Sequence, residues 1–142
     1  MATNLERTGT ARPADGVWVL RFAYPNNPLP MNGAKGAWRA RARKTREVRE
    51  LASFLARSAR IPTLGHCTAQ VTWWVANNRT RDVDNLAAFE KAVFDGLVDA
   101  GVVPDDSPRF MNKPRGTIRH VTDSDGLVTQ PCFTVTITRA GA

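Results

Sequence analysis

The sequence predicts a single α+β domain in which a mixed β-sheet of about four strands carries two main helices. Its 142 residues and 42% hydrophobic content suit one ordinary domain with its own core. Segments that alternate apolar and polar residues occur in both halves of the chain, and two segments with helical periodicity lie between them. Elements of these two kinds bury their apolar faces by packing in layers. We therefore expect residues 1–142 to form one domain, in which residues 1–15 are a polar N-terminal extension.

The expected strands are recognised by side chains that alternate between two faces. In the first strand, Trp18, Leu20 and Phe22 share one face, and a run rich in Pro and Asn then ends it. The segment around Gly116 is the least regular, because this glycine and several charges interrupt its period. The four expected strands are residues 16–24, 67–75, 113–121 and 132–139.

The first expected helix covers residues 42–59. Its apolar residues, which include Val48 and Leu55, fall within roughly a 100° arc at 3.6 residues per turn. If the helix reaches back far enough, an arginine stripe lies about 180° from Val48 and is a candidate contact for phosphates. The alternative is an ordinary solvated face. The stripe consists of Arg39, Arg43, Arg46 and Arg57.

The second expected helix begins near Val83 or Asp84 and ends at Gly101, a residue type that favours the left-handed position after a helix. Its apolar residues, from Leu86 onward, gather on one face. Asp84, Lys91 and Asp95 fall on the opposite face. We therefore expect the core and the polar chemistry of this helix to lie on opposite sides.

Charge is distributed unevenly along the chain, whose formal net charge is +7. Seven of its thirteen acids lie between Asp82 and Asp106 beside a single base, so this segment carries −6 and the rest +13. A strongly basic surface suits a polyanionic partner such as nucleic acid or an anionic membrane. Against the membrane, no apolar run approaches the roughly 20 residues that span a bilayer, and the first residues lack a signal-peptide core. We therefore expect a cytoplasmic protein.

The cysteines and histidines are expected to be structural. Cys67 and Cys132 lie far apart with no Cys-x-x-Cys spacing, which favours two reduced thiols over a zinc site or a disulfide framework. His66 and His120 have no partner at metal-ligand spacing.

Three carboxylates and one lysine are expected to converge near the start of the second helix. Asp82 and Asp84 flank its first residue, and the turn that contains Asp105 and Asp106 could fold back beside them. Mg²⁺ takes oxygen ligands, usually one or two carboxylates with waters and substrate phosphate. The alternative is that the first two aspartates only cap the helix, while Pro-Asp-Asp-Ser is simply a turn. The basic residues around the cluster favour the metal site.

The motif resembles the RusA-like Holliday junction resolvases, a family common in phage and prophage genomes. The resemblance implies a homodimeric endonuclease that depends on Mg²⁺, with Mn²⁺ as an alternative, and nicks symmetrically related strands of four-way DNA junctions. It covers about a fifth of the chain closely and most of it loosely. The matching segments, in family order, are residues 81–86, 94–97, 100–101 and 105–106.

The resemblance also implies roles for individual residues. Asp82, Asp84 and Asp106 match the metal-binding or catalytic aspartates of the family. The family's essential lysine follows the second aspartate by four residues, a position held here by Ala88, whereas Lys91 follows by seven. Both spacings lie on one helical face, so the role passes to Lys91, whose competing assignment is a surface ion pair with Asp95.

The remaining basic residues are expected to hold the DNA backbone, which positions DNA without reading its sequence. A non-catalytic basic DNA-binding protein is the rival from another class. A related metal nuclease that cuts other branched DNA, such as flaps or mismatches, is a third alternative. The candidate DNA contacts are Lys35, Arg39, Arg43, Arg46, Arg79, Arg81, Lys113 and Arg115.

Overall fold

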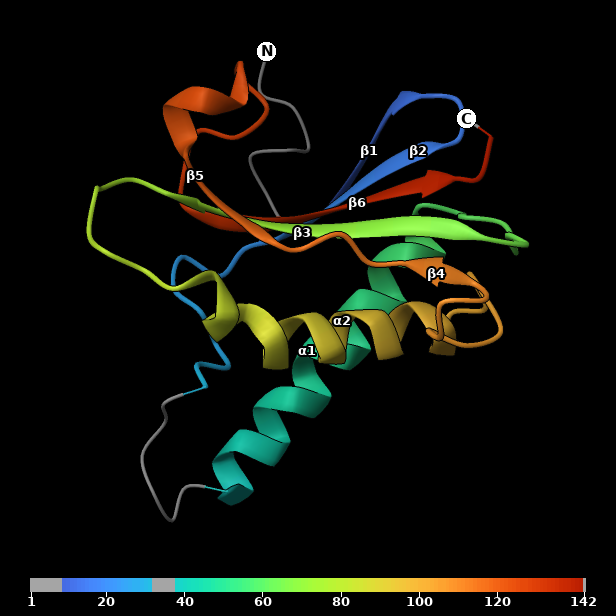
Figure 1. The fold of residues 1–142 in the computed structure, drawn as a ribbon, viewed down its shortest axis with the longest axis horizontal. Coiled ribbons are helices and arrows are strands. Elements are labelled where there is room, and N and C mark those ends of the chain that lie inside the picture. The colour runs from blue at the N-terminus through green and yellow to red at the C-terminus, as the bar shows by residue number, and fades with distance from the viewer. Residues whose placement is uncertain (1–8, 32–37, 142) are drawn as a thin grey trace.

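The computed structural model describes residues 9–31 and 38–141, and it confirms an α+β fold with two main helices on one face of a mixed sheet (Figure 1). The sheet has six strands rather than about four, in the order β1-β2-β6-β3-β4, with β5 also paired to β3. The strands are β1 (Gly9–Ala14), β2 (Val17–Phe22), β3 (Cys67–Val75), β4 (Met111–Asn112), β5 (Thr117–His120) and β6 (Cys132–Arg139).

The sheet is mixed because its two halves are connected differently. Strands β1, β2, β6 and β3 pair antiparallel in that order, whereas β4 and β5 both run parallel to β3. The parallel pairs are reached through α2, which crosses over one face of the sheet between β3 and β4 (Figure 1). Helix α2 therefore begins close to the end of β3, and Asp82 and Asp84 lie in the segment that joins the two.

Strand β1 differs from the expected polar extension, because residues 9–14 pair with β2. Its register shifts between Ala11 and Ala14, and Pro13 lies in that irregular stretch. Proline lacks a backbone N–H, so in sheets it occurs at edges and bulges. A short edge strand of this kind has little apolar alternation, and the sequence pattern therefore missed it.

Helix α1 (Trp38–Ser58) begins four residues before the predicted start, so the condition for the arginine stripe is met. Helix α2 (Ala87–Asp99) follows a 3₁₀ turn, η2 (Val83–Leu86), and Gly101 beyond it has the predicted left-handed φ of 80°. The two helices approach closely at Gly96, where a Cβ atom would meet the Arg49 carbonyl oxygen and lie 2.7 Å from the Cβ of Ala52. Glycine is therefore required at this crossing.

The main core lies between the helices and the sheet, and it fixes the rotation of α2. Phe89 is fully buried, with its ring centroid 4.3 Å from that of Phe133 in β6 and 5.6 Å from that of Phe22 in β2. Because this face of α2 is anchored, the opposite face points away from the sheet, as the periodicity predicts. The buried residues of the α2 region include Leu86, Phe89, Val93, Phe94 and Leu97.

A smaller cluster lies on the other face of the sheet. It contains Trp74 and Cys132, with Val128 from the segment after a 3₁₀ turn, η3 (Val121–Ser124). Cys67 belongs instead to the main core, so the two cysteines lie on opposite faces of the sheet. Both are buried and free, which confirms the expectation of structural thiols. In the described part of the chain, no helix has the length and apolarity needed to cross a membrane.

Candidate functional site

Asp82 and Asp84 occupy the start of η2, and local backbone chemistry sets their positions. Asp82 is the residue before the turn, and its Oδ1 accepts a hydrogen bond from the backbone N–H of Asp84 at 2.9 Å. Such a cap satisfies a backbone donor that the turn leaves without a partner. Asp84 then lies in the first turn, with 78% of its side chain exposed. The two carboxylates are therefore neighbours on an open surface, and Asp82 does cap as the alternative interpretation predicts.

Both aspartates line one hollow, which we call the Asp82 hollow. Its wall also contains Arg79, Arg81 and Trp73. The Arg81 guanidinium lies 5.0 Å from the centre of the Trp73 ring and donates to the carbonyl oxygen of Arg79 at 3.0 Å. Stacking and neutral acceptors hold this cation in place without cancelling its charge. The hollow therefore combines two exposed carboxylates with two arginines.

Two asparagines fasten the loop that follows β2 to this hollow, although the sequence indicates no individual role for either of them. The Asn85 side-chain oxygen accepts from the backbone N–H of Met31 at 2.5 Å. The Asn27 side chain donates to the backbone oxygen of Asn85 at 3.0 Å. These bonds span more than fifty residues of sequence, so no local pattern could have shown them. Lys35, a candidate DNA contact in the same loop, lies outside the described residues.

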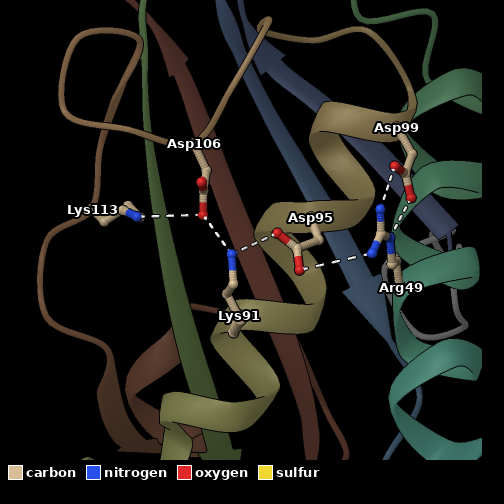
Figure 2. A network of polar contacts seen from close by, with 6 residues as sticks. All are labelled: Arg49, Lys91, Asp95, Asp99, Asp106 and Lys113. Carbon is tan, nitrogen blue, oxygen red and sulfur yellow. Dashed lines mark hydrogen bonds and ion pairs between the residues drawn. The ribbon is translucent and has the colours of Figure 1, made fainter. Parts of the chain in front are cut away.

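A second hollow, the Lys91 hollow, lies along α2 and contains Lys91, Asp106 and Lys113. The Lys91 Nζ is 2.9 Å from the Asp95 Oδ1 and 3.3 Å from the Asp106 Oδ2, and the Lys113 Nζ is 3.5 Å from that same Asp106 oxygen (Figure 2). The competing assignment of Lys91, an ion pair with Asp95, is thus observed. Asp106 folds back onto α2 at Lys91 rather than at the start of η2.

The charges in this hollow shift one another's pKa values. Burial raises the pKa of the Asp106 carboxyl, but the charge of Lys113 and the hydrogen bond and charge of Lys91 outweigh burial, so that pKa lies below its usual value. The pKa of Lys91 is raised, chiefly by its hydrogen bond to Asp95. Both groups are therefore held in their charged forms at neutral pH.

The chain of ion pairs continues from α2 into α1. The Arg49 Nη1 lies 4.0 Å from the Asp95 Oδ2, and its Nε donates to the Asp99 Oδ2 at 2.6 Å (Figure 2). The hydrogen bond from Arg49 is the main reason why the pKa of Asp99 is lowered. The acids of the second half of α2 are thus balanced by cations within the fold.

Glu90 also lines the Lys91 hollow, although the sequence did not predict a role for it. It is half-buried, and burial raises the pKa of its carboxyl despite a hydrogen bond from the backbone N–H of Gly116 and the nearby charges of Arg115 and Lys113. On the helix it lies between buried Phe89 and exposed Lys91. Its position at the boundary of the apolar face is the one sequence signal that indicates partial burial.

Arg115 connects the two hollows. Its Nη2 lies 2.8 Å from the Asp84 Oδ1, and the same side chain lines the Lys91 hollow. Both members of this pair are exposed, at 70% and 78% of the side chain, so water and salt weaken their attraction. A phosphate or a cation could therefore displace the pair at small cost.

The exposed face of α1 carries the predicted arginine stripe. Arg39, Arg43 and Arg46 are exposed, and none of them forms an ion pair with another described residue. Trp38, 68% exposed, lies under Arg39 at the beginning of the helix. This end of α1 extends away from the sheet (Figure 1). These three arginines are therefore exposed cations without an ion pair among the described residues, whereas Arg57, the fourth predicted member of the stripe, lies close enough to Asp99 for its charge to help lower the pKa of that carboxyl.

The predicted metal ligands are divided between the two hollows. Asp82 and Asp84 lie together, whereas the contacts of Asp106 are with Lys91 and Lys113. Among residues 9–31 and 38–141, no three His, Cys, Asp or Glu side chains group as ligands for one metal ion. The pair in the Asp82 hollow still fits Mg²⁺, which often uses only one or two protein carboxylates.

No protein-family model matches the chain, and a search of curated proteins finds no significant match. What the site does is therefore inferred from the residues that form it.

Proposed function

We propose that this protein is a metal-dependent endodeoxyribonuclease that cuts branched DNA, with four-way junctions as its substrate. The observation that carries the proposal is the Asp82 hollow, where two exposed carboxylates lie beside Arg79 and Arg81 on a chain with net charge +7. Arginines attract a DNA phosphate to this place, and carboxylates repel it. A divalent cation held by Asp82 and Asp84 removes that conflict.

The roles of the individual residues follow from their contacts. Asp82 and Asp84 would hold Mg²⁺ or Mn²⁺, which when bound supplies Lewis acidity and lowers the pKa of a water. Arg81, held in place over Trp73, orients the phosphate. Arg115 leaves Asp84 and pairs with DNA instead. Lys91, fixed by Asp106 and Asp95, stabilises charge that develops near the cut.

The substrate class and the assembly follow from the distribution of charge and from the resemblance to RusA-like resolvases. The arginine stripe of α1 and the pair Lys113 and Arg115 supply two separate groups of cations, which would suit contacts with more than one DNA arm. A four-way junction offers two symmetry-related strands. A homodimer with one Asp82 hollow in each subunit would cut both.

A second candidate, a non-catalytic DNA-binding protein, is favoured by a specific observation. Asp84 and Asp106 are already paired with Arg115 and with Lys91, and Asp82 caps η2. In such a protein these acids would only stabilise the fold. DNA binding would then need no divalent cation, and loss of Asp84 would have no effect beyond its ion pair.

The deciding experiment measures cleavage of a labelled immobile four-way junction against linear duplex and flap DNA, in Mg²⁺ or in EDTA. Wild type is compared with Asp84→Asn and with a matched control, Asp105→Asn, which changes an exposed aspartate outside both hollows. We expect paired symmetric nicks that need both Mg²⁺ and Asp84 and that persist in the control.

Other outcomes identify the alternatives. A junction that is bound but remains uncut with every divalent cation would establish the non-catalytic protein. Preferential cutting of flaps, still dependent on Asp84, would establish a related nuclease with a different substrate. Equal activity of Asp84→Asn and wild type would remove the Asp82 hollow from the chemistry.

A further inference from the structure

A third hollow adjoins the Asp82 hollow across the loop that follows β3. We call it the Arg119 hollow. It has a volume of about 480 Å³ and is lined by Arg79 and Arg81, which it shares with the Asp82 hollow, and by Arg119, His120 and Asp123. Neither the sequence pattern nor the proposed chemistry assigns it a role.

Arg119 is held in this hollow by the register of the sheet. In the parallel pairing of β3 with β5, Arg119 lies opposite Trp74, and its guanidinium is 5.0 Å from the centre of that ring. Its Nη2 donates to the backbone oxygen of Asp123 at 3.0 Å. One cation–π contact and one neutral acceptor thus fix the side chain and leave its charge in place.

Arg81 is held in the same manner, but by Trp73, the residue of β3 that precedes Trp74. It stacks on Trp73, and its Nη2 donates to the Asn77 Oδ1 at 2.8 Å. Successive side chains of a strand point to opposite faces, so the two tryptophans support arginines on the two sides of the strand's end. Arg81 and Arg119 nevertheless both line the Arg119 hollow, and each guanidinium is bound mainly to neutral partners.

The balance of charge separates this hollow from the Lys91 hollow. In the Lys91 hollow both lysines contact the carboxylate of Asp106. In the Arg119 hollow three arginines face one acid, Asp123, whose backbone oxygen rather than its carboxylate bonds to Arg119. A net positive hollow with planar, preorganised guanidinium donors is suited to a phosphate, which accepts two parallel bonds from arginine.

We infer that the Arg119 hollow binds a backbone phosphodiester of DNA that flanks the phosphate at the Asp82 hollow. The inference rests on the proposed function for the identity of the ligand, and the sharing of Arg79 and Arg81 by the two hollows supplies the link between them. His120, expected to be structural, caps η3 through its Nδ1, which accepts from the backbone N–H of Thr122 at 3.2 Å, and it forms part of the wall of the hollow. A free phosphate has the same chemistry as the diester, so the experiment must separate the two sources.

The test compares Arg119→Gln with a matched control, Arg139→Gln. Arg139 also stacks on a tryptophan, Trp18 at 5.5 Å, but it lies opposite Cys67, at the other end of β3 from Trp74. Both variants lose one charge and one cation–π contact. Affinity for a labelled four-way junction is measured in EDTA over a series of salt concentrations, so cleavage plays no part. We expect Arg119→Gln to weaken binding roughly tenfold, the loss of one charged hydrogen-bonded contact, and to lower the salt slope by about one.

The control should retain the wild-type salt slope at its full value. Equal slopes in Arg119→Gln and wild type, or equal losses in both variants, would overturn the subsite. If Arg119→Gln lowers the salt slope but the wild-type protein never cuts the junction, the proposed nuclease is rejected and the phosphate subsite is kept. If the wild-type protein cuts the junction but Arg119→Gln has the wild-type salt slope, the subsite is rejected and the proposed nuclease is kept.

Two further arms complete the design. Asp123→Asn removes the one acid and no stacking contact, and it should tighten junction binding a few-fold, so the test survives if Arg119→Gln fails to fold. Inorganic phosphate is also titrated against junction binding, at ionic strength matched with chloride. We expect phosphate to displace DNA from wild type better than chloride does and to lose this advantage in Arg119→Gln. If Arg119→Gln abolishes the advantage of phosphate over chloride but binds the junction as tightly as wild type does, the hollow binds free phosphate and its assignment to DNA is overturned.

Discussion

The Asp82 hollow and the Lys91 hollow both pair acids with bases, but they neutralise their acids differently. In the Asp82 hollow, the Asp84 carboxylate is 78% exposed and its cation, Arg115, is almost as exposed. In the Lys91 hollow, the Asp106 carboxylate is only 18% exposed and contacts two lysines. Exposed pairs contribute about 0–1 kcal/mol and exchange readily. The first hollow is therefore open to a ligand, whereas the second is already balanced by the fold.

The pKa shifts support the same distinction. The lowered pKa of Asp106 means that its charged form is favoured by folding, so its contribution to stability is complete above the unfolded value of about 3.9 and is lost as the pH falls below it. A balanced network of this kind positions Lys91. It does not need a metal ion to remain stable at neutral pH.

The substitution expected to have the largest effect is Asp82→Asn, because it removes a carboxylate that would hold the metal ion. It keeps the cap of η2, so the effect on cleavage can be measured apart from any effect on stability. Asparagine caps a helix about as well as aspartate, so the free energy of unfolding should change by less than about 0.5 kcal/mol. Cleavage should fall by more than about 100-fold, since even outer partners of metal sites cost roughly 10–100-fold. Junction cleavage and urea unfolding measure the two effects.

Asp82→Ala serves as the companion variant. It removes the cap as well as the charge, and it should cost about 1 kcal/mol of stability on top of the lost cleavage. If Asp82→Asn cuts junctions as wild type does, Asp82 acts only as a cap, and the contrast between the two hollows loses its functional meaning.

Gly96→Ala tests whether the balanced region is structural. Alanine favours a helix over glycine by about 1 kcal/mol, yet here its Cβ would meet the Arg49 carbonyl oxygen and Ala52. Overpacking should prevail and lower the free energy of unfolding by roughly 1–3 kcal/mol. Gly65→Ala is the control, because a Cβ atom added there would meet no other part of the protein within 4 Å. A Gly96→Ala protein as stable as wild type would mean that the α1–α2 contact yields easily.

Lys91→Met is expected to have a smaller effect, on cleavage alone. Lys91 is 64% exposed, so its loss should slow cleavage about tenfold, less than the roughly 100-fold of a buried donor. Asp95→Asn removes the same ion pair but keeps the lysine, and it should leave the cleavage rate within about twofold of wild type. Equal rates for both variants would show that the lysine only forms a surface pair.

The sequence predicted those features that depend on local periodicity. The phase of α2, the cap at Asp82 and the left-handed Gly101 all follow from rules that act within one or two turns of helix. The arginine stripe of α1 has the same origin. These features include the Asp82 hollow's two carboxylates, because both belong to a single short turn.

Features that depend on long-range pairing were predicted poorly. Strand β1 is recognised by its pairing with β2, and the separation of Asp106 from Asp84 depends on the path of residues 102–113. Arg119 stacks on Trp74 only because β5 pairs with β3 in one register. Sheet register is set by the whole sheet, so neither contact leaves a local pattern in the sequence.

The smallest expected effect concerns Glu90, the one acid of the Lys91 hollow whose pKa is raised. Burial raises it, so folding favours the protonated form, and that stability is complete below the unfolded pKa of about 4.3 and is lost as the pH rises through the folded value. Glu90→Gln should therefore gain stability relative to wild type between pH 4 and pH 7. The gain should be only a few tenths of a kcal/mol, because the carboxyl is half exposed and solvent screens it.

Urea unfolding at pH 4 and pH 7 measures this gain, with exposed Glu50→Gln on α1 as the control. Asp106 is present in both wild type and variant, so most of its opposite pH dependence cancels in the difference. A Glu90→Gln protein that is less stable than wild type at pH 7 would mean that Gly116, Arg115 and Lys113 stabilise the ionised carboxylate more than burial destabilises it. Glu90 would then be the second balanced acid of the Lys91 hollow, beside Asp106, and the contrast with the open Asp82 hollow would become sharper.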